Sequence, residues 1–198
     1  MRSLASVLPA TPVRRLVYTS STRVYGRDDG SWVEEDTPPE PRDEKGRILL
    51  QSERIALAAF TPSFPRRDPD VARVSSRADR SVTVLRLGGI HGPGREAEPR
   101  IVAQAGTTRD DGNVYVNLIH RDDIVETVRR LLRMPYHGVL NLTDGHPVLR
   151  RVWYDRMLAM RNLPAIDWTD RDAPVRGKRV SNMRARKLLG LDFRTPVP

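Results

Sequence analysis

Short apolar runs mark the expected strands of this chain. The first run, at 13–19, ends in a cluster of hydroxyl residues, and the second, at 82–90 (VTVLRLGGI), is almost continuous. A near-continuous apolar run is typical of a strand that is buried on both faces of a parallel sheet. The runs at 115–119 and 138–142 (GVLNL) predict two further short strands.

Segments with apolar residues at helical spacing lie between and after these runs. They predict helices over 48–60, 124–134 and 148–161 and a last one between Ser181 and Gly190. Asp122-Asp123 is expected to cap the second helix, Ser181 to cap the last, and Gly190 to end it. Strands that alternate with helices along the chain indicate an α/β fold with a parallel sheet.

Two segments show neither pattern. The stretch 26–47 contains prolines at 38, 39 and 41, which exclude both a helix and a central strand, so it predicts a long loop. The stretch 61–81 combines Pro and Arg without any periodicity, which favours a flexible surface insertion over a recognition arm. No internal repeat is visible, and one domain over 1–198 is the economical interpretation.

Composition narrows the classes of protein that these elements could form. A net charge of +9 suggests a nucleic-acid partner, but the basic residues are spread along the chain and only 6% of residues are aromatic. We therefore favour a solvated basic surface over a nucleic-acid site. The absence of Cys excludes disulfides and thiolate metal sites and suits the reducing cytoplasm. No apolar run approaches the roughly 18 residues of a membrane-spanning helix.

Four motifs give the chain a resemblance to a known family. They are TSSTRVYG at 19–26, LRLGGIHGPGR at 85–95, IHRDDI at 119–124 and RGKRVSNMRARKLLG at 176–190. They resemble the C-terminal part of the extended and atypical short-chain dehydrogenase/reductases, the NAD(P)-dependent epimerase/dehydratase family. The resemblance implies an incomplete Rossmann-like parallel sheet with helices and a small C-terminal subregion on the substrate side. It also implies NAD or NADP as cofactor of the intact fold, and a small carbonyl or sugar-derived substrate.

The resemblance assigns candidate site residues as well. Ser21 falls on the family's strand-end serine, whose hydroxyl donates a hydrogen bond to the substrate oxygen at the reacting carbon and can polarise a carbonyl there. A serine that only satisfies backbone groups in a tight turn is the alternative. Tyr25, in the following turn, suits packing better than acid/base chemistry. The implied cofactor contacts are Thr19, Ser20, Gly88, Gly89 and Ile90, and the implied substrate contacts are Arg95 and Asn117.

The sequence departs from the family pattern at three points. Lys45 stands where the family has its acid/base tyrosine, and Leu49 stands where it has the lysine that lowers the tyrosine pKa. No Gly-rich turn of the kind that binds a dinucleotide pyrophosphate occurs. The four histidines share no metal-ligand spacing, and we assign no metal.

These departures lead to expectations about assembly and activity. We expect a truncated fold that lacks its first βα units, so that the strand at 13–19 becomes an apolar sheet edge. Such an edge would pair with a second copy of the chain or with a completing segment. The alternative function is that of a non-catalytic remnant of the fold or an interaction module, with nucleic-acid binding less favoured.

Overall fold

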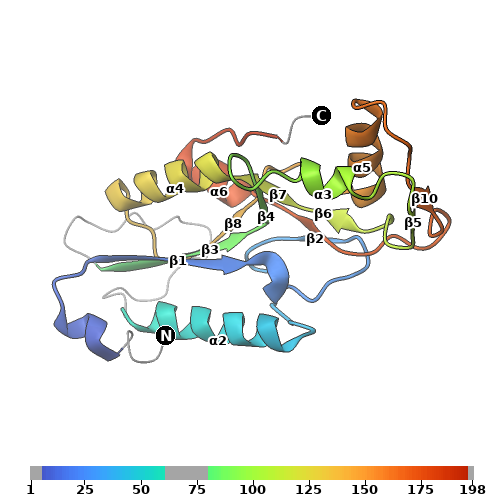
Figure 1. The fold of residues 1–198 in the computed structure, drawn as a ribbon. Coiled ribbons are helices and arrows are strands. Elements are labelled where there is room, and N and C mark those ends of the chain that lie inside the picture. The colour runs from blue at the N-terminus through green and yellow to red at the C-terminus, as the bar shows by residue number, and fades with distance from the viewer. Residues whose placement is uncertain (1–5, 61–79, 196–198) are drawn as a thin grey trace.

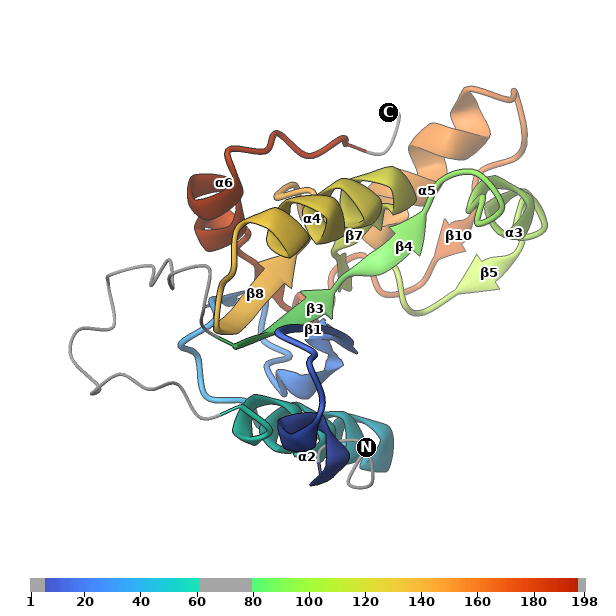
Figure 2. The same ribbon diagram turned by 90° about the vertical axis from the view of Figure 1, so that its left-hand side faces the viewer.

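The computed structural model describes residues 6–60 and 80–195. Figures 1 and 2 show helices packed on both faces of a small central sheet. The strands are β1 (Arg15–Ser21), β2 (Trp32–Val33), β3 (Ser81–Leu87), β4 (Gly89–His91), β5 (Thr108–Arg109), β6 (Tyr115–Val116), β7 (Leu118–His120), β8 (Gly138–Leu142), β9 (Val148–Leu149), β10 (Asp167–Trp168) and β11 (Arg179–Val180). The helices are α2 (Glu44–Ala58), α3 (Glu98–Val102), α4 (Arg121–Arg133), α5 (Arg150–Ala159) and α6 (Met183–Leu189), with 3-10 turns η1 (Leu8–Ala10) and η2 (Thr22–Val24).

The central sheet is parallel and has the strand order β1-β3-β8. Helix α2 covers one face of this sheet, and α4 and α6 cover the other (Figure 1). Each parallel connection therefore crosses over through a helix, as an α/β fold requires. The predicted fold class is confirmed.

Strand β3 lies in the middle of this sheet, and all seven of its residues are buried. Leu85 and Leu87 join the apolar cluster on the side of α4 and α6, whereas Val82 joins the cluster on the side of α2. Because successive side chains of a strand point to opposite faces, a strand that is covered on both faces must be apolar at almost every position. The pattern at 82–90 identified this strand correctly. Its exception is Arg86, which is also buried.

The ends of the helices correct three details of the sequence analysis. Helix α2 begins at Glu44, before the predicted start at 48, because the Asp43 carboxylate accepts a hydrogen bond from the Gly46 N–H at 2.7 Å and caps the helix. His120 caps α4 through Nδ1, so that the predicted capping pair Asp122-Asp123 lies inside the first turn.

The last helix, α6, has Asn182 rather than Ser181 at its N-cap. Its predicted end is confirmed, since Gly190 adopts a left-handed conformation with φ of 60°. A residue without Cβ enters that region at little cost, which makes glycine the common terminator.

Short strand pairs are the elements that the sequence pattern missed. The predicted loop at 26–47 contains β2, which pairs in parallel with β11, and the predicted strand at 115–119 is divided at Asn117 into β6 and β7. Strand β7 pairs with β4, the continuation of β3 beyond Gly88, and so extends the layer toward the C-terminal part. A pair of two residues carries no periodicity of its own, and its partners lie far away in the sequence.

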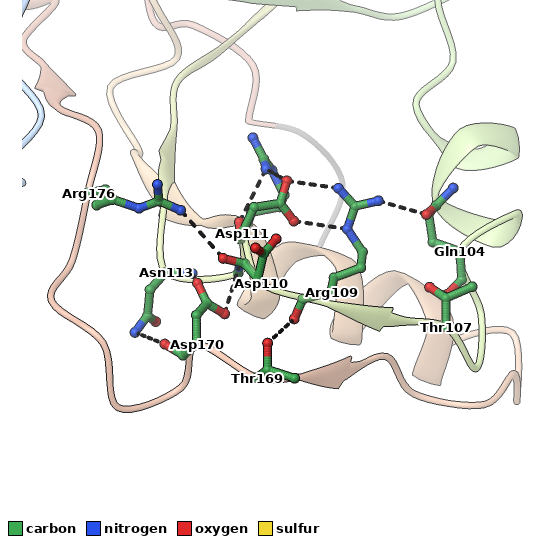
Figure 3. A network of polar contacts seen from close by, with 11 residues as sticks. Gln104, Thr107, Arg109, Asp110, Asp111, Asn113, Thr169, Asp170 and Arg176 are labelled. Atoms are coloured by element: carbon green, nitrogen blue, oxygen red, sulfur yellow. Dashed lines mark hydrogen bonds and ion pairs between the residues drawn. The ribbon is translucent and has the colours of Figure 1, made fainter.

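A small C-terminal subregion lies beyond the carboxyl ends of β1 and β3 (Figure 1). Its apolar cluster includes Trp153, Leu158 and Ile166. Polar contacts close its loops: the Asp170 carboxylate accepts the N–H groups of Gly112 and Asn113 at 3.1 and 2.8 Å. Figure 3 shows this network and the neighbouring pair of Arg109 and Asp111. The subregion is therefore held by its own contacts next to the sheet.

Two expectations concern the borders of this fold. The predicted insertion at 61–81 lies outside the described residues except for its last two positions. Strand β1 pairs with β3 on one side, and no strand pairs with its other side in the part of the chain that the structure describes. Among the same residues, no helix is long and apolar enough to cross a membrane.

Candidate functional site

Ser21 ends β1 and begins η2 at the carboxyl edge of the sheet. Its Oγ accepts a hydrogen bond from the backbone N–H of Arg23 at 3.2 Å. The hydroxyl hydrogen is not used in this contact and can be donated to a ligand. The serine therefore satisfies a backbone group, as the alternative interpretation expects, and its hydrogen bond to a substrate oxygen stays a prediction.

Ser20, the preceding residue, points into a buried ion pair. Its hydroxyl donates to Glu53 Oε1 at 2.5 Å, and Arg86 donates to both oxygens of the same carboxylate, the shorter contact being 2.8 Å. The side chains of Arg86 and Glu53 are 5% and 2% exposed. Ser20 thus has its acceptor inside the protein, on the side of α2, and its predicted contact with a cofactor stays a prediction.

Tyr25 lies next to the buried Arg86–Glu53 ion pair. Its hydroxyl donates to Asn141 Oδ1 at 2.8 Å, and the Arg86 guanidinium lies 4.8 Å from the centre of its ring. Burial raises the pKa of Tyr25 above its ordinary value, and Arg86 opposes that shift. A buried phenol with a high pKa and a committed proton is a poor acid or base, so the structure supports packing for Tyr25.

The two positions of the missing catalytic pair lie in the first turns of α2. Lys45 is exposed, and Leu49 packs against the cluster that contains Val24, Tyr25 and Val180. An apolar contact therefore occupies the place of the family's lysine. The leucine carries no charge, so this position cannot lower the pKa of a nearby acid as the family's lysine does.

A shallow cavity of about 380 Å³, wide open to solvent, lies beside Ser21. Its walls come from residues 21–28 after β1, from Arg42 and Asp43 before α2, and from Gly177 and Lys178 before β11. Three segments that are distant in the sequence thus meet at the strand end. In parallel α/β sheets, ligands bind in this region beyond the carboxyl ends of the strands.

Lys178 is a residue of this cavity that the sequence analysis did not single out. It belongs to the motif at 176–190, but the pattern of that motif predicts only the helix that follows Lys178. The side-chain amide of Asn117 fixes it: Nδ2 donates to the Lys178 carbonyl at 2.8 Å, and Oδ1 accepts from the Val180 N–H at 2.8 Å. Asn117, a predicted substrate contact, holds the backbone of the cavity wall.

The predicted cofactor loop follows β3. A Cβ on Gly88 would come within 2.7 Å of the carbonyl oxygen of Asn117, which lies between β6 and β7, so the backbone at Asn117 by itself requires a glycine there. Gly89 is exposed, and Ile90 is half-buried. Of the residues predicted on β1, Thr19 is exposed near the strand end. The side of the loop that is open to a ligand is therefore formed at Gly89 and Ile90.

Arg95 lies on the exposed turn after β4 and does not line the cavity beside Ser21. The neighbouring His91 and His120 rings meet edge to face with centroids 5.2 Å apart. Within the described ranges, no three His, Asp or Glu side chains form a group that could hold a metal ion.

Asp144 is a second residue that the sequence analysis missed. It follows β8 and is 2% exposed. Its Oδ1 accepts from the His146 N–H at 2.9 Å, whereas Oδ2 has no hydrogen-bond partner among the described residues. Burial raises the pKa of Asp144 to about 6. The surrounding Thr-Asp-Gly sequence is typical of a turn, which hides this property in the sequence.

The sheet and its covering helices form a Rossmann-like fold, and comparisons with known proteins find the same fold in NAD-dependent epimerases and dehydratases. No family model matches the chain. Protein YeeZ of Escherichia coli K12 is 31% identical to it over 188 residues, which are 94% of this chain and 60% of YeeZ. The structure of MoeE5 in complex with UDP-glucuronic acid and NAD is similar with a TM-score of 0.74 and 26% identity, over 98% of this chain and 64% of MoeE5.

A third similar protein is UDP-glucuronic acid 4-epimerase from Bacillus cereus in complex with NAD. It has a TM-score of 0.72 and covers 98% of this chain and 59% of its own, but at 16% identity it supports the fold alone. The chain thus spans less than two thirds of the length of each of these proteins. The chain has the fold of the NAD-dependent epimerase/dehydratase family, and the resemblance that the four motifs predict is confirmed.

Proposed function

We propose that this chain is the substrate-side part of an NAD(P)-dependent reductase or epimerase that acts on a small carbonyl or sugar-derived compound. The observation that carries this proposal is the position of Ser21, which lines a cavity at the carboxyl edge of the sheet and keeps a hydroxyl hydrogen to donate. The similarity to MoeE5, whose structure holds UDP-glucuronic acid and NAD, supports the same class of reaction.

The chain offers a partial fit to a dinucleotide. Thr19, Gly89 and Ile90 would contact the nicotinamide end, since Gly89 is exposed and carries no side chain. The close approach of Asn117 explains a glycine at position 88 without a cofactor, so that the predicted cofactor contact of Gly88 stays a prediction. When bound, NAD(P) supplies the hydride donor or acceptor that this chemistry needs.

Ser21 has one task in this chemistry. Its hydroxyl donates a hydrogen bond to the substrate oxygen and stabilises the negative charge that develops when the carbonyl carbon accepts a hydride. The turn of η2 fixes the serine oxygen through the Arg23 N–H, so that the donor is oriented before the substrate arrives. Tyr25 does not supply the proton, because its hydroxyl is donated to Asn141.

Titration of the 198-residue chain with NADH and NADPH, followed by nicotinamide fluorescence, tests this proposal. We expect saturable binding that a branched side chain at an exposed glycine weakens, as in Gly89→Val. Because a Cβ at this position would lie 3.2 Å from Leu118 Cδ2, the melting temperature of the variant is measured beside that of the unaltered chain. Absence of binding at millimolar cofactor would contradict the proposal for this chain.

Absence of cofactor binding would favour a non-catalytic module. The contact of Leu49 with the Tyr25 cluster favours it already, since it replaces a catalytic cation by packing. In either case we propose a cytoplasmic protein, because the chain has no Cys to form disulfides, and a single domain, because its length suits one domain and no repeat is visible.

The free side of β1 supports a further proposal on assembly. A strand without a neighbour presents backbone N–H and C=O groups that can pair with another strand. We propose that this edge pairs with a second copy or with a completing segment. Light scattering of the purified chain checks this: a monomer that unfolds cooperatively would contradict it.

A further inference from the structure

The cavity beside Ser21 has an excess of positive charge in its walls. Four cationic side chains line it, against the carboxylates of Asp28 and Asp43: Arg23, Arg27, Arg42 and Lys178. Each carboxylate already has a cation, since Arg23 lies 2.7 Å from Asp43 and Arg42 lies 2.9 Å from Asp28. In the part of the chain that the structure describes, Arg27 and Lys178 form no ion pair. These two cations therefore have no ion-pair partner of their own, although Asp28 acts on Lys178 from a longer distance.

Lys178 is the more strongly held of these two cations. Its carbonyl accepts the Asn117 amide, and the preceding Gly177 N–H donates to Asp28 Oδ1 at 2.7 Å. The residue is half-buried. A partly desolvated ammonium that forms no close ion pair is unfavourable, because burial costs more for a charge than for a neutral group. An anion that entered the cavity would remove this cost.

Ser21 lines the same cavity, so that an anion held there would lie next to the carbon on which the hydroxyl acts. We propose that this cavity binds the anionic substituent, a carboxylate or a phosphate, of the substrate, with Lys178 as the main contact and Arg27 as the second. The inference rests on the proposed function, in which Ser21 addresses the substrate oxygen. It narrows the substrate from a small carbonyl or sugar-derived compound to an acidic one.

The charges around Lys178 also set the pH range of binding. Burial lowers the pKa of Lys178, and Arg42 and Arg23 lower it further, while Asp28 has the opposite effect. These groups come from all the segments that form the cavity wall. Since only the ammonium attracts an anion, affinity is expected to be constant at lower pH and to fall as the pH rises through the lowered pKa of Lys178.

Three probes with one sugar ring test the proposal: glucuronate, glucose 1-phosphate and glucose, titrated by calorimetry at constant ionic strength. We expect saturable binding of at least one of the two acids and none of glucose. The preferred acid tells a carboxylate substrate from a phosphate one. Lys178→Gln should weaken binding roughly tenfold or more, as the loss of a charge-assisted hydrogen bond does, and Lys178→Arg should retain most of it.

Lys187→Gln is the matched control, because it removes the same charge from an exposed position of α6, outside the cavity. Its affinity should equal that of the unaltered chain. Equal binding of glucose and the acids, equal loss in both glutamine variants, or no binding of either acid would overturn the proposal. This experiment contains no cofactor. It therefore tests anion binding independently of the NADH titration, and either proposal can fail without the other.

Discussion

Two regions on either side of the β1 end use the same arginine–carboxylate chemistry in opposite ways. Behind Ser20, the Arg86–Glu53 pair is almost fully buried, with side chains 5% and 2% exposed. Around Ser21, the Arg42–Asp28 pair faces the cavity and solvent, with side chains 65% and 39% exposed. A buried pair cannot lose one partner without leaving an uncompensated charge, whereas solvent screens an exposed pair.

Under the proposed function, consecutive residues of one strand serve structure and ligand binding separately. Successive side chains of β1 point to opposite sides, so that Ser20 reaches the core and Ser21 reaches the strand-end cavity. The buried pair ties α2 to β3 and to Ser20, which fixes the strand end from behind. If a ligand binds as proposed, the cations at the cavity exchange partners with it at little cost to the fold, because their ion pairs are exposed.

Loss of the buried pair should give the largest effect. Glu53→Gln leaves the Arg86 guanidinium without its counter-charge in the core, and we expect the free energy of unfolding to fall by about 3–5 kcal/mol. Urea denaturation followed by circular dichroism measures this. The double variant Glu53→Leu/Arg86→Met, which removes both charges, should recover most of the loss. A single variant as stable as the original chain would show that the pair does not hold the strand end.

Asp144 is a buried carboxylate that forms no ion pair within the described residues, so loss of its charge should stabilise the fold at neutral pH, opposite in sign to the loss of Glu53. Its pKa in the folded chain is raised to about 6 from 3.8, so folding favours the protonated acid. Its contribution to stability is therefore complete below about pH 4 and is lost as the pH rises through 6, by roughly 3 kcal/mol according to the linkage of pKa to stability.

Asp144→Asn keeps an oxygen that can accept the His146 N–H but removes the titration. We expect this variant to be more stable than the original chain at pH 7 and nearly equal to it at pH 4, as measured by thermal melting at both values. A difference between the two chains that is the same at both pH values would contradict the assigned pKa.

The sequence predicted the elements whose patterns are local. The apolar run of β3, the GVLNL run of β8 and the helical spacing of α2 and α4 each reflect a face that the core covers, and each is found near its predicted place. The pair of β2 and β11 was missed because its register depends on contacts between residues that are far apart in the chain.

The candidate site was predicted only in part, because some of its residues depend on contacts between distant segments. Ser21 stands in a motif that is continuous in the sequence, and the structure places it at the strand end as that motif implies. Lys178 and Asp144 gain their chemistry only from burial and from neighbours on other segments. No spacing in the chain expresses such burial, so sequence reasoning could name the strand-end serine but not the charges around it.

The two serines offer a sharper test of the comparison. Ser20→Ala removes a buried hydroxyl that donates to a carboxylate, and we expect a loss of about 2 kcal/mol in unfolding free energy with little direct effect on ligand binding. Ser21→Ala removes only the cap of a short turn, at a cost below about 1 kcal/mol. Under the proposed function, the second variant should nevertheless abolish most turnover. Equal effects of both variants on stability would mean that the strand end does not separate the two tasks.

The smallest change in stability is expected at the exposed pair. Arg42→Gln should alter the unfolding free energy by less than about 0.5 kcal/mol, because solvent screens this contact, and Asp28 stays in place through the Gly177 N–H. The same variant should raise the pKa of Lys178, since it removes a positive neighbour and frees the charge of Asp28. The chain has only three lysines, so NMR of labelled lysine can follow Lys178 with Lys45 and Lys187 as internal references. A pKa that falls or stays constant would show that Arg42 does not act on the cavity lysine, and that the exposed pair is a surface contact without influence on the site.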